Sequence, residues 1–263
     1  MTHQGTALIT GASSGIGAVY AERLARRGYD LILVARNRDR LNDLAKRITS
    51  ESGRQVEVLD ADLNDRASLT RVEHKLKEDA SITLLVNNAG IGTYTALLDS
   101  DVDQMTRMIE LNVTAPTRLT YAAVPGFIAR GRGAIINISS IVSIAPEILN
   151  GVYGGSKAFV TAFSQSLHRE LADKGIRVQA VLPGATATDF WATGGLPLEY
   201  LDPAIVMSAD DLVDSALIDF DHGELISIPS LHALEAWQTY ENARQNLSTQ
   251  LSSNVPAPRY STH

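Results

Sequence analysis

The sequence of 263 residues contains no cysteine. This excludes a disulfide framework, a thiolate nucleophile and a cysteine-based metal site, and it is typical of a reducing compartment. The six histidines are scattered along the chain, and none has the spacing of a metal-ligand pair. We therefore expect no metal centre.

A block of positive charge is also missing. Lys and Arg together number 23 against 30 Asp and Glu, which gives a formal net charge of -7. Because such a chain offers no cationic surface to a phosphate backbone or an anionic bilayer, we expect neither a nucleic acid nor a membrane as a partner.

Long apolar runs are absent as well. No segment approaches the ~20 consecutive apolar residues that a membrane-spanning helix needs. The first residues, 1–6, have neither the charged nor the apolar region of a secretory signal peptide. The sequence therefore predicts a cytoplasmic protein.

The composition that remains is that of an ordinary globular protein, with 44% hydrophobic and 20% charged residues. At this length a single α/β domain can bury about three quarters of the surface of its unfolded chain. We expect one domain over residues 1–251, in which about 189–207 covers the substrate, and a flexible tail over 252–263.

Short apolar runs alternate with segments of helical periodicity along most of the chain. The expected strands are 6–10, 30–35, 56–59, 82–86, 133–139, 178–182 and 225–228. The expected helices are 15–27, 41–48, 67–76, 102–130 with interruptions near Pro116 and Pro125, 152–173, 208–219 and 231–247. This alternation predicts a single Rossmann-type α/β domain: a doubly wound, mostly parallel seven-stranded sheet with helices on both faces.

A glycine-rich turn joins the first strand to the first helix. Its spacing is Gly-x-x-x-Gly-x-Gly, and its candidate cofactor residues are Gly11, Ser13, Ser14, Gly15, Ile16 and Gly17. Backbone N–H groups and the helix dipole at such a turn form a pocket for a pyrophosphate. The turn indicates a dinucleotide site.

The same stretch also matches the G-x-S-x-G pattern of hydrolases, with Ser13 as the nucleophile. A nucleophile elbow should lie deep in the sheet, ahead of an acid and a histidine, whereas Ser13 follows the first strand. The hydrolase alternative is therefore disfavoured.

The end of the second strand bears on the choice between NAD and NADP. Where an NAD-binding protein places an acidic residue for the ribose 2′-hydroxyl, this chain has Ala35 followed by Arg36. A guanidinium at that place can bind a 2′-phosphate, which favours NADP(H) over NAD(H). The alternative is a solvent-facing arginine in the polar run 36–40.

Tyr153 and Lys157 lie four residues apart, so on a helix both side chains leave the same face. An ammonium group near a phenol favours the phenolate, which makes tyrosine usable as a general acid and base near pH 7. The alternative is an exposed helix pair without catalytic meaning.

Taken in order, these motifs resemble the short-chain dehydrogenase/reductase family in its short, single-domain form. The resemblance covers most of the chain up to about residue 189. It is carried by 10–17, Asp62–Leu63, Asn87–Gly90, Asn112, Ser140, Tyr153, Lys157 and 183–188.

The resemblance implies a role for each matching catalytic residue. Tyr153 would exchange a proton with the substrate oxygen, which Ser140 would hold by a hydrogen bond. Lys157 would lower the pKa of the tyrosine and hold the nicotinamide ribose, and Asn112 would position a water molecule beside it. Alone, Asn112 could equally be a helix residue that bonds a neighbouring carbonyl.

The resemblance also implies a set of cofactor residues, in which Tyr153 and Lys157 are again included. Asp62 and Leu63 would contact the adenine, and Thr188 would bond the carboxamide. The remaining residues expected along the cofactor are Asn88, Ala89, Gly90, Pro183, Gly184 and Thr186. Asn88 has an alternative role, because an asparagine after a strand often satisfies backbone groups.

Two departures from the family pattern occur near the expected site. Val142 and Ser143 replace the small residue and the glycine that often follow the serine. Gly154 and Gly155 each cost a helix about 1 kcal/mol relative to alanine, which we interpret as room for a ligand near the backbone.

These observations predict an NADP(H)-dependent oxidoreductase that transfers hydride to or from the carbonyl or alcohol carbon of a small, neutral, hydrophobic substrate. The expected pocket residues are Ile141, Val142, Ile144, Ala145, Pro146, Ile148, Phe190, Trp191 and Leu196. A non-catalytic NADP(H)-binding sensor or scaffold is the alternative, and an isomerase or dehydratase of the extended family form has little room in 263 residues. The resemblance further implies a homodimer or homotetramer through helices 102–130 and 152–173.

Overall fold

The computed structural model describes residues 3–260. The chain divides into two compact units, one ending at Ser230 and the other beginning at Leu231. The first unit carries every residue of the expected site.

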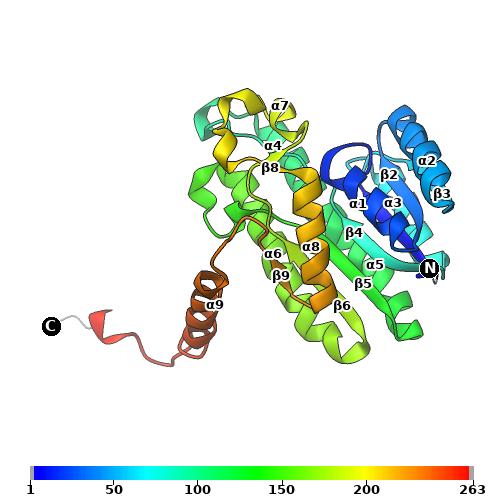
Figure 1. Ribbon diagram of the computed structural model, residues 1–263. Helices are drawn as coiled ribbons and strands as arrows, with labels where there is room; N and C mark the ends of the chain where they lie inside the picture. Colours follow the sequence, from blue (N-terminus) through cyan, green and yellow to red (C-terminus); the bar gives the residue numbers. More distant parts are fainter. Residues whose placement is uncertain (1–2, 261–263) are drawn as a thin grey trace. The chain divides into compact units, whose positions relative to one another are not determined.

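A seven-stranded sheet forms the centre of the first unit (Figure 1). Its strands are β1 (Thr6–Thr10), β2 (Asp30–Ala35), β3 (Val56–Asp60), β4 (Ile82–Asn87), β5 (Gly133–Ile138), β6 (Ile176–Val181) and β9 (Ile226–Ser227). Their order is β3-β2-β1-β4-β5-β6-β9, and all neighbouring pairs are parallel. The predicted seven-stranded parallel sheet is confirmed.

Helices cover both faces of this sheet. The first core contains residues of α1 (Gly15–Arg26), α2 (Arg38–Ser52) and α8 (Ala209–His222), and the second contains residues of α3 (Arg66–Glu78), α5 (Ala115–Arg130) and α6 (Gly151–Leu171). Strands between two such layers are apolar on both sides, and all five residues of β1 are buried. The doubly wound architecture is thereby confirmed.

From β1 to β3 successive strands are added on one side of β1, and from β4 to β9 they are added on the other side. The strand order therefore reverses between β1 and β4. In open parallel sheets a crevice forms at this point, outside the carboxyl ends of the strands, and ligands bind there. Thr10 and Asn87 end β1 and β4 at this crevice. The glycine turn and the loop after Asn87 therefore lie at its rim.

The long helix expected over 102–130 consists of α4 (Val102–Ile109), a π-helical turn (Glu110–Thr114) and α5. The interruption near Pro116 is present as this turn, but α5 continues through Pro125, so the second expected interruption is wrong. Ala122, Ala123 and Phe127 are buried around Pro125, and their packing stabilises the helix across the missing N–H donor.

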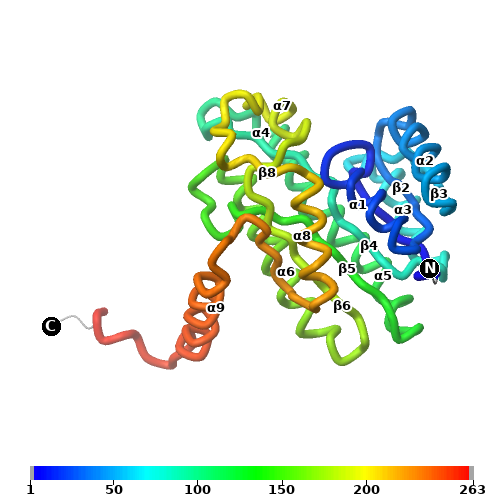
Figure 2. The backbone as a smooth tube through the Cα atoms, viewed as in Figure 1, coloured from blue at the N-terminus to red at the C-terminus, as the bar shows by residue number. Residues whose placement is uncertain are grey.

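A second, two-stranded parallel sheet pairs β7 (Thr186–Ala187) with β8 (Met207–Ser208). It holds together the two ends of the segment expected to cover the substrate, which carries the short helix α7 (Phe190–Thr193) and is the yellow stretch leading to β8 in Figure 2. Short 3₁₀ turns occupy Leu97–Asp99, Ile141–Ser143, Pro146–Ile148, Ala172–Lys174, Leu198–Tyr200, Pro203–Ile205 and Pro258–Tyr260.

The second unit contains α9 (Leu234–Ser248), and none of the residues of this helix is buried. The division at Ser230 thus precedes the domain end expected at 251, because the apolar residues of this helix are not part of a core. Residues 261–263 of the expected flexible tail lie outside the described residues. Within residues 3–260 no helix is both long and apolar enough to cross a membrane.

Candidate active site

Asn150 fixes the start of α6, the helix that carries Tyr153 and Lys157. Its Oδ1 accepts hydrogen bonds from the backbone N–H of Val152 (2.9 Å) and of Tyr153 (3.4 Å). Its Nδ2 donates to the carbonyl of Thr95 (2.6 Å), in the loop that follows β4. Asparagine is a preferred N-cap residue, but this position was not among the predicted site residues.

Tyr153 and Lys157 are both buried, with 5% of each residue exposed. The Lys157 Nζ lies 5.8 Å from the centroid of the Tyr153 ring and donates to the carbonyl oxygen of Ile138 (2.9 Å), the last residue of β5. The pair is therefore not the exposed helix pair of the alternative interpretation.

Burial governs the pKa of both groups. It raises the pKa of Tyr153 to about 12, although a hydrogen bond with the Ser140 side chain acts in the opposite direction. Burial also lowers the pKa of Lys157 to about 8. The expected lowering of the tyrosine pKa by Lys157 is not seen: burial raises the pKa, and the opposing contribution comes from the hydrogen bond with Ser140. Tyr153 is thus a neutral phenol at pH 7.

Asn112 lies in the π-helical turn and clamps the loop after β4. Its Nδ2 donates to the carbonyl of Ile91 (2.8 Å) and to the Ser156 hydroxyl (3.0 Å), and its Oδ1 accepts from the Ile91 N–H (3.0 Å). A Cβ on Gly90 would lie 3.2 Å from this Oδ1 and 3.4 Å from the Lys157 Nζ. The structure therefore brings Gly90, Asn112 and Lys157 together, and π turns of this kind are frequent at functional sites.

The glycine turn is shaped for a group that approaches the backbone. Gly11 and Gly15 have positive φ, and a Cβ on Gly17 would lie 2.4 Å from the Gly11 carbonyl oxygen. Ser14, the N-cap of α1, makes no side-chain cap bond within the described chain, and the first turn holds no acidic residue. Free N–H groups and an uncompensated helix dipole fit a pyrophosphate.

Asn88 links this turn to β4. Its Nδ2 donates to the carbonyls of Thr10 (2.9 Å) and Gly11 (3.1 Å). In return the Thr10 hydroxyl accepts from the N–H groups of Asn88 and Ala89, both at 3.0 Å. Asn88 therefore performs the backbone-satisfying role of its alternative interpretation, and Thr10 is a positioning residue that the sequence-based list omits.

The expected adenine end of the cofactor site lies beyond β2 and β3. Arg36 is exposed directly after β2, next to the start of α2. The Asp62 Oδ1 accepts the N–H of Asn64 (3.0 Å), and Leu63 is buried in the second core. Asp62 and Leu63 thus shape the loop after β3.

The expected nicotinamide end lies beyond β5 and β6. The Ser140 hydroxyl donates to the carbonyl of Pro183 (3.4 Å), which joins the ends of these two strands. The Thr186 hydroxyl donates to the Gly184 carbonyl (3.1 Å). A Cβ on Gly15 would lie 3.0 Å from the methyl carbon of Thr188, so the segment after β6 reaches the glycine turn.

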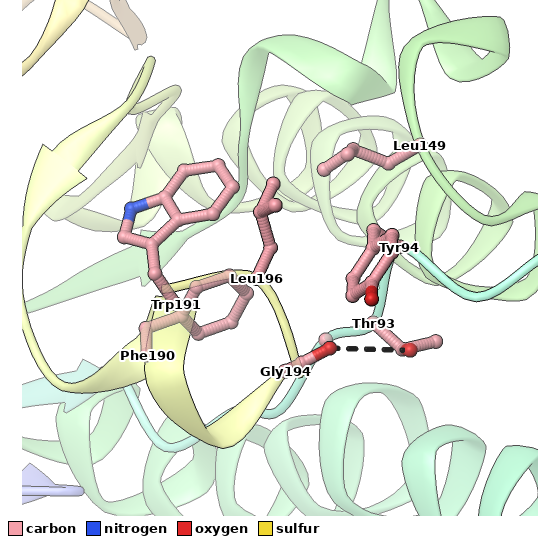
Figure 3. A pocket seen from close by; sticks show the side chains of 8 residues that line it. Thr93, Tyr94, Leu149, Phe190, Trp191, Gly194 and Leu196 are labelled. Carbon is pink, nitrogen blue, oxygen red and sulfur yellow. Dashed lines mark hydrogen bonds between the residues drawn. The ribbon is translucent and has the colours of Figure 1, made fainter. Parts of the chain in front are cut away.

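A small pocket, with about 210 Å³ of space that is partly open to solvent, is lined in part by Phe190, whose ring lies next to that of Tyr153. Figure 3 shows side chains from the loop after β4 facing those of the 190–196 segment. The pocket is lined by Gly92, Thr93, Tyr94, Leu149, Phe190, Trp191, Gly194 and Leu196.

The three pocket residues expected from the 190–196 segment are in place. The six expected from 141–148 do not line this pocket: Val142 is buried against Tyr153, Pro146 packs on Gly154, and Ile148 is exposed. The loop at 92–94 was missed because it has no periodicity, although its place directly after the Asn87–Gly90 motif could have indicated it. No cluster of three metal-ligating side chains occurs in the described part of the chain.

Comparisons with known proteins identify the family of the chain. A model of the short chain dehydrogenase family matches residues 5–195. A short-chain dehydrogenase from Sphingobium yanoikuyae, solved in complex with NADPH, is 49% identical with a TM-score of 0.95, and the match covers 98% of this chain and 100% of that one. The bulky-bulky ketone specific alcohol dehydrogenase from Comamonas testosteroni is 47% identical with a TM-score of 0.90, covering 98% and 99%.

Among curated proteins, the very-long-chain 3-oxoacyl-CoA reductase of Anas platyrhynchos is 38% identical over 190 residues. This match covers 69% of the present chain and 60% of the relative, so the chain spans less than two thirds of that protein's length. The hydrolase alternative has no support from these matches. The family model covers more than half of the chain, including the glycine turn, Tyr153 and Lys157. The chain therefore belongs to the short-chain dehydrogenase family and is an oxidoreductase.

Proposed function

We propose that the protein is an NADP(H)-dependent reductase of bulky, neutral, hydrophobic ketones, reversible as an alcohol dehydrogenase. The observation that carries the proposal is the burial of a neutral Tyr153 phenol beside the Lys157 ammonium and the Ser140 hydroxyl. A buried proton donor of this kind serves a reaction in which negative charge develops on an oxygen atom.

The glycine turn, Asn88 and Lys157 would hold NADP(H), which supplies or accepts the hydride when bound. The chain's own residues then manage the oxygen atom of the substrate. Ser140 would hold this oxygen by a hydrogen bond, and Tyr153 would donate its hydroxyl proton to it as the carbonyl is reduced. Lys157 would stabilise the resulting phenolate through its positive charge, because the two groups share a desolvated site.

The character of the pocket supports the substrate class. Leu149, Phe190, Trp191 and Leu196 contribute apolar surface, and none of the eight lining residues carries a charge. A carboxylate substrate would therefore be desolvated without a partner. The likeness to the Comamonas testosteroni enzyme, whose described specificity is for bulky-bulky ketones, supports a ketone with large substituents.

Arg36 supports NADP(H) as the cofactor, and its effect can be separated from net charge. The substitution Arg36→Asp is expected to weaken NADPH binding by at least about tenfold and NADH binding much less, because only NADPH carries the 2′-phosphate. Titration of both cofactors by fluorescence measures this. Arg132→Asp, at the amino end of β5, is the matched control for charge. Equal losses for NADPH and NADH would refute the role of Arg36.

A panel of ketones and aldehydes, assayed by NADPH and NADH oxidation in parallel, tests the activity itself. The expected result is turnover of hydrophobic ketones with NADPH, and a loss of about 100-fold or more in kcat for Tyr153→Phe while NADPH binding is retained, because the glycine turn and Lys157 remain. The sensor or scaffold would instead be favoured if the protein binds NADPH tightly, turns over no substrate, and shows no change in NADPH oxidation on Tyr153→Phe.

A further inference from the structure

The Phe190 ring occupies the space that a side chain at Gly92 would need. A Cβ on Gly92 would lie 2.4 Å from the Cζ of Phe190 and 3.0 Å from the Cε2 of Tyr153. Both ring atoms are therefore close to one point. Since Cε2 is bonded to the carbon that carries the hydroxyl, Phe190 lies at the reacting end of the phenol, with the ring centroids 5.7 Å apart.

A second glycine brings the covering segment close to the same loop. A Cβ on Gly194 would lie 3.0 Å from the Gly92 carbonyl oxygen. The Thr93 hydroxyl donates to the Gly194 carbonyl over 3.4 Å, a long hydrogen bond that joins the two segments (Figure 3). Contact between the segments thus depends mainly on the absence of side chains at Gly92 and Gly194.

Phe190 and Trp191 are held differently. The Trp191 indole donates to the Thr186 carbonyl at 2.9 Å, which anchors it to β7. Phe190 has only apolar contacts, with Tyr153 and with the edge of Trp191 at 5.8 Å between centroids. The Phe190 ring can therefore leave Tyr153 without breaking a hydrogen bond of its own side chain.

We propose that Phe190 is a displaceable cover over the reacting end of Tyr153, that Gly92 is the positioning residue that permits this cover, and that together they discriminate against small ketones. The inference rests on the ketone reduction proposed above. A substrate must push the ring away from Tyr153 and Gly92 before its carbonyl can reach the hydroxyl. A bulky apolar ketone replaces the lost contacts with its own contacts to the displaced ring, whereas a small ketone does not.

The size of the pocket agrees with this competition. The space in it that a water-sized sphere can occupy is only about 10 Å³, roughly the room that one water molecule needs. With the ring in place, a large substituent has no room beside Tyr153. Movement of Phe190 is what provides it.

A chemical test of the cover needs no substrate. Tetranitromethane nitrates tyrosine at the ring carbons next to the hydroxyl, and one of these is the Cε2 that Phe190 covers. Phe190→Ala is expected to accelerate nitration of Tyr153 severalfold in the cofactor-free protein. Peptide mass spectrometry measures it, with exposed Tyr260 as the internal standard. Unchanged nitration of Tyr153 in Phe190→Ala would overturn the cover.

Kinetics with two ketones test the discrimination. The ratio of kcat/KM for valerophenone to that for butanone is expected to fall by about fivefold in Phe190→Ala and in Gly92→Ala, the size of one aromatic contact. The double variant is expected to show the ratio of Phe190→Ala alone, because Gly92 acts through the ring. Gly155→Ala, whose new methyl group would project into open space, is the matched control and keeps the wild-type ratio.

Each outcome decides a separate point. If Gly92→Ala changes the ratio as strongly in the Phe190→Ala protein as in the wild type, the new methyl group crowds the substrate directly and the proposed role of Gly92 is wrong. If nitration responds as expected but no ketone is reduced, the cover stands and the proposed function fails. Thermal unfolding of each variant shows that it is folded, and a changed ratio in a variant of wild-type Tm is not an effect of stability.

Discussion

Lys157 is a buried cation whose ammonium group donates to the neutral carbonyl oxygen of Ile138. Burial lowers its pKa from 10.5 to about 8. Below the lowered pKa the folded protein must bury a charge that the unfolded chain leaves in water. As the pH rises from about 8 towards 10.5, the unfolded state binds more protons than the folded state, so stability from this group increases with pH.

The substitution Lys157→Met removes this dependence. Between pH 7 and pH 9 the stability of the wild type relative to Lys157→Met is expected to rise by about 1 kcal/mol. Urea denaturation of the cofactor-free proteins at both pH values measures it. The raised pKa of Tyr153 acts in the opposite direction, but only above pH 10, where the folded state retains its proton. A difference that stays constant across this range would show that Lys157 is not desolvated.

The adjacent glycines Gly154 and Gly155 differ in their surroundings. A Cβ on Gly154 would lie 3.0 to 3.1 Å from three atoms of Pro146, two of them backbone, whereas one on Gly155 would meet open space. Contact with the 146–148 turn thus explains Gly154 without a ligand, contrary to the interpretation from sequence. Nothing in the structure explains Gly155.

Alanine substitutions at these two positions are therefore expected to change stability in opposite directions. Gly154→Ala should destabilise the protein by about 1–3 kcal/mol through overpacking, and Gly155→Ala should stabilise it by up to about 1 kcal/mol through helix propensity. Urea midpoints of the two variants provide the comparison. A loss of stability in both would mean that the exposed face of α6 is covered in solution.

At the scale of elements, the start of α6 depends on one side chain. Asn150 caps the helix and also bonds the Thr95 carbonyl and the Ser100 hydroxyl. Asn150→Ala is expected to cost about 1–2 kcal/mol of stability, and to lower kcat more than it raises KM because Tyr153 lies in the first turn. Denaturation and steady-state kinetics measure the two effects.

Asn150→Ser separates the two contributions of this residue. Serine keeps a cap acceptor but is too short to keep the bond to Thr95, so its stability should lie between those of the wild type and Asn150→Ala. If both variants lose the same stability, the tie to the loop after β4 matters and the cap does not.

Elements with a local signal were predictable from sequence, and contacts between loops were not. Strands such as β1 and β4 are rich in apolar residues because both faces are buried, and the glycine turn and the Tyr153–Lys157 spacing are local patterns. The π turn at Asn112 depends on bonds to Ile91 and Ser156, which come from other parts of the chain. The pocket at Gly92 likewise depends on Phe190, 98 residues further along (190 − 92).

At the scale of the whole molecule, the helices expected to form a subunit interface present apolar side chains to solvent. Val102 on α4, Tyr121 on α5 and Phe159 on α6 are 74%, 70% and 38% exposed. Apolar residues exposed on neighbouring helices are typical of interaction surfaces, and closed symmetric assemblies are the commonest arrangement of identical chains. We predict that the protein is a homodimer or homotetramer in which these helices are covered.

Light scattering coupled to size-exclusion chromatography tests this assembly. The wild type is expected to elute with the mass of a dimer or tetramer, and Tyr121→Glu with a smaller mass, because a carboxylate would be buried without a partner. Ile218→Glu is the matched control, since Ile218 is similarly exposed on α8, a helix that packs on the opposite face of the sheet from α5. Its mass should remain that of the wild type. A monomeric wild type, or equal dissociation by both substitutions, would contradict an interface through α5.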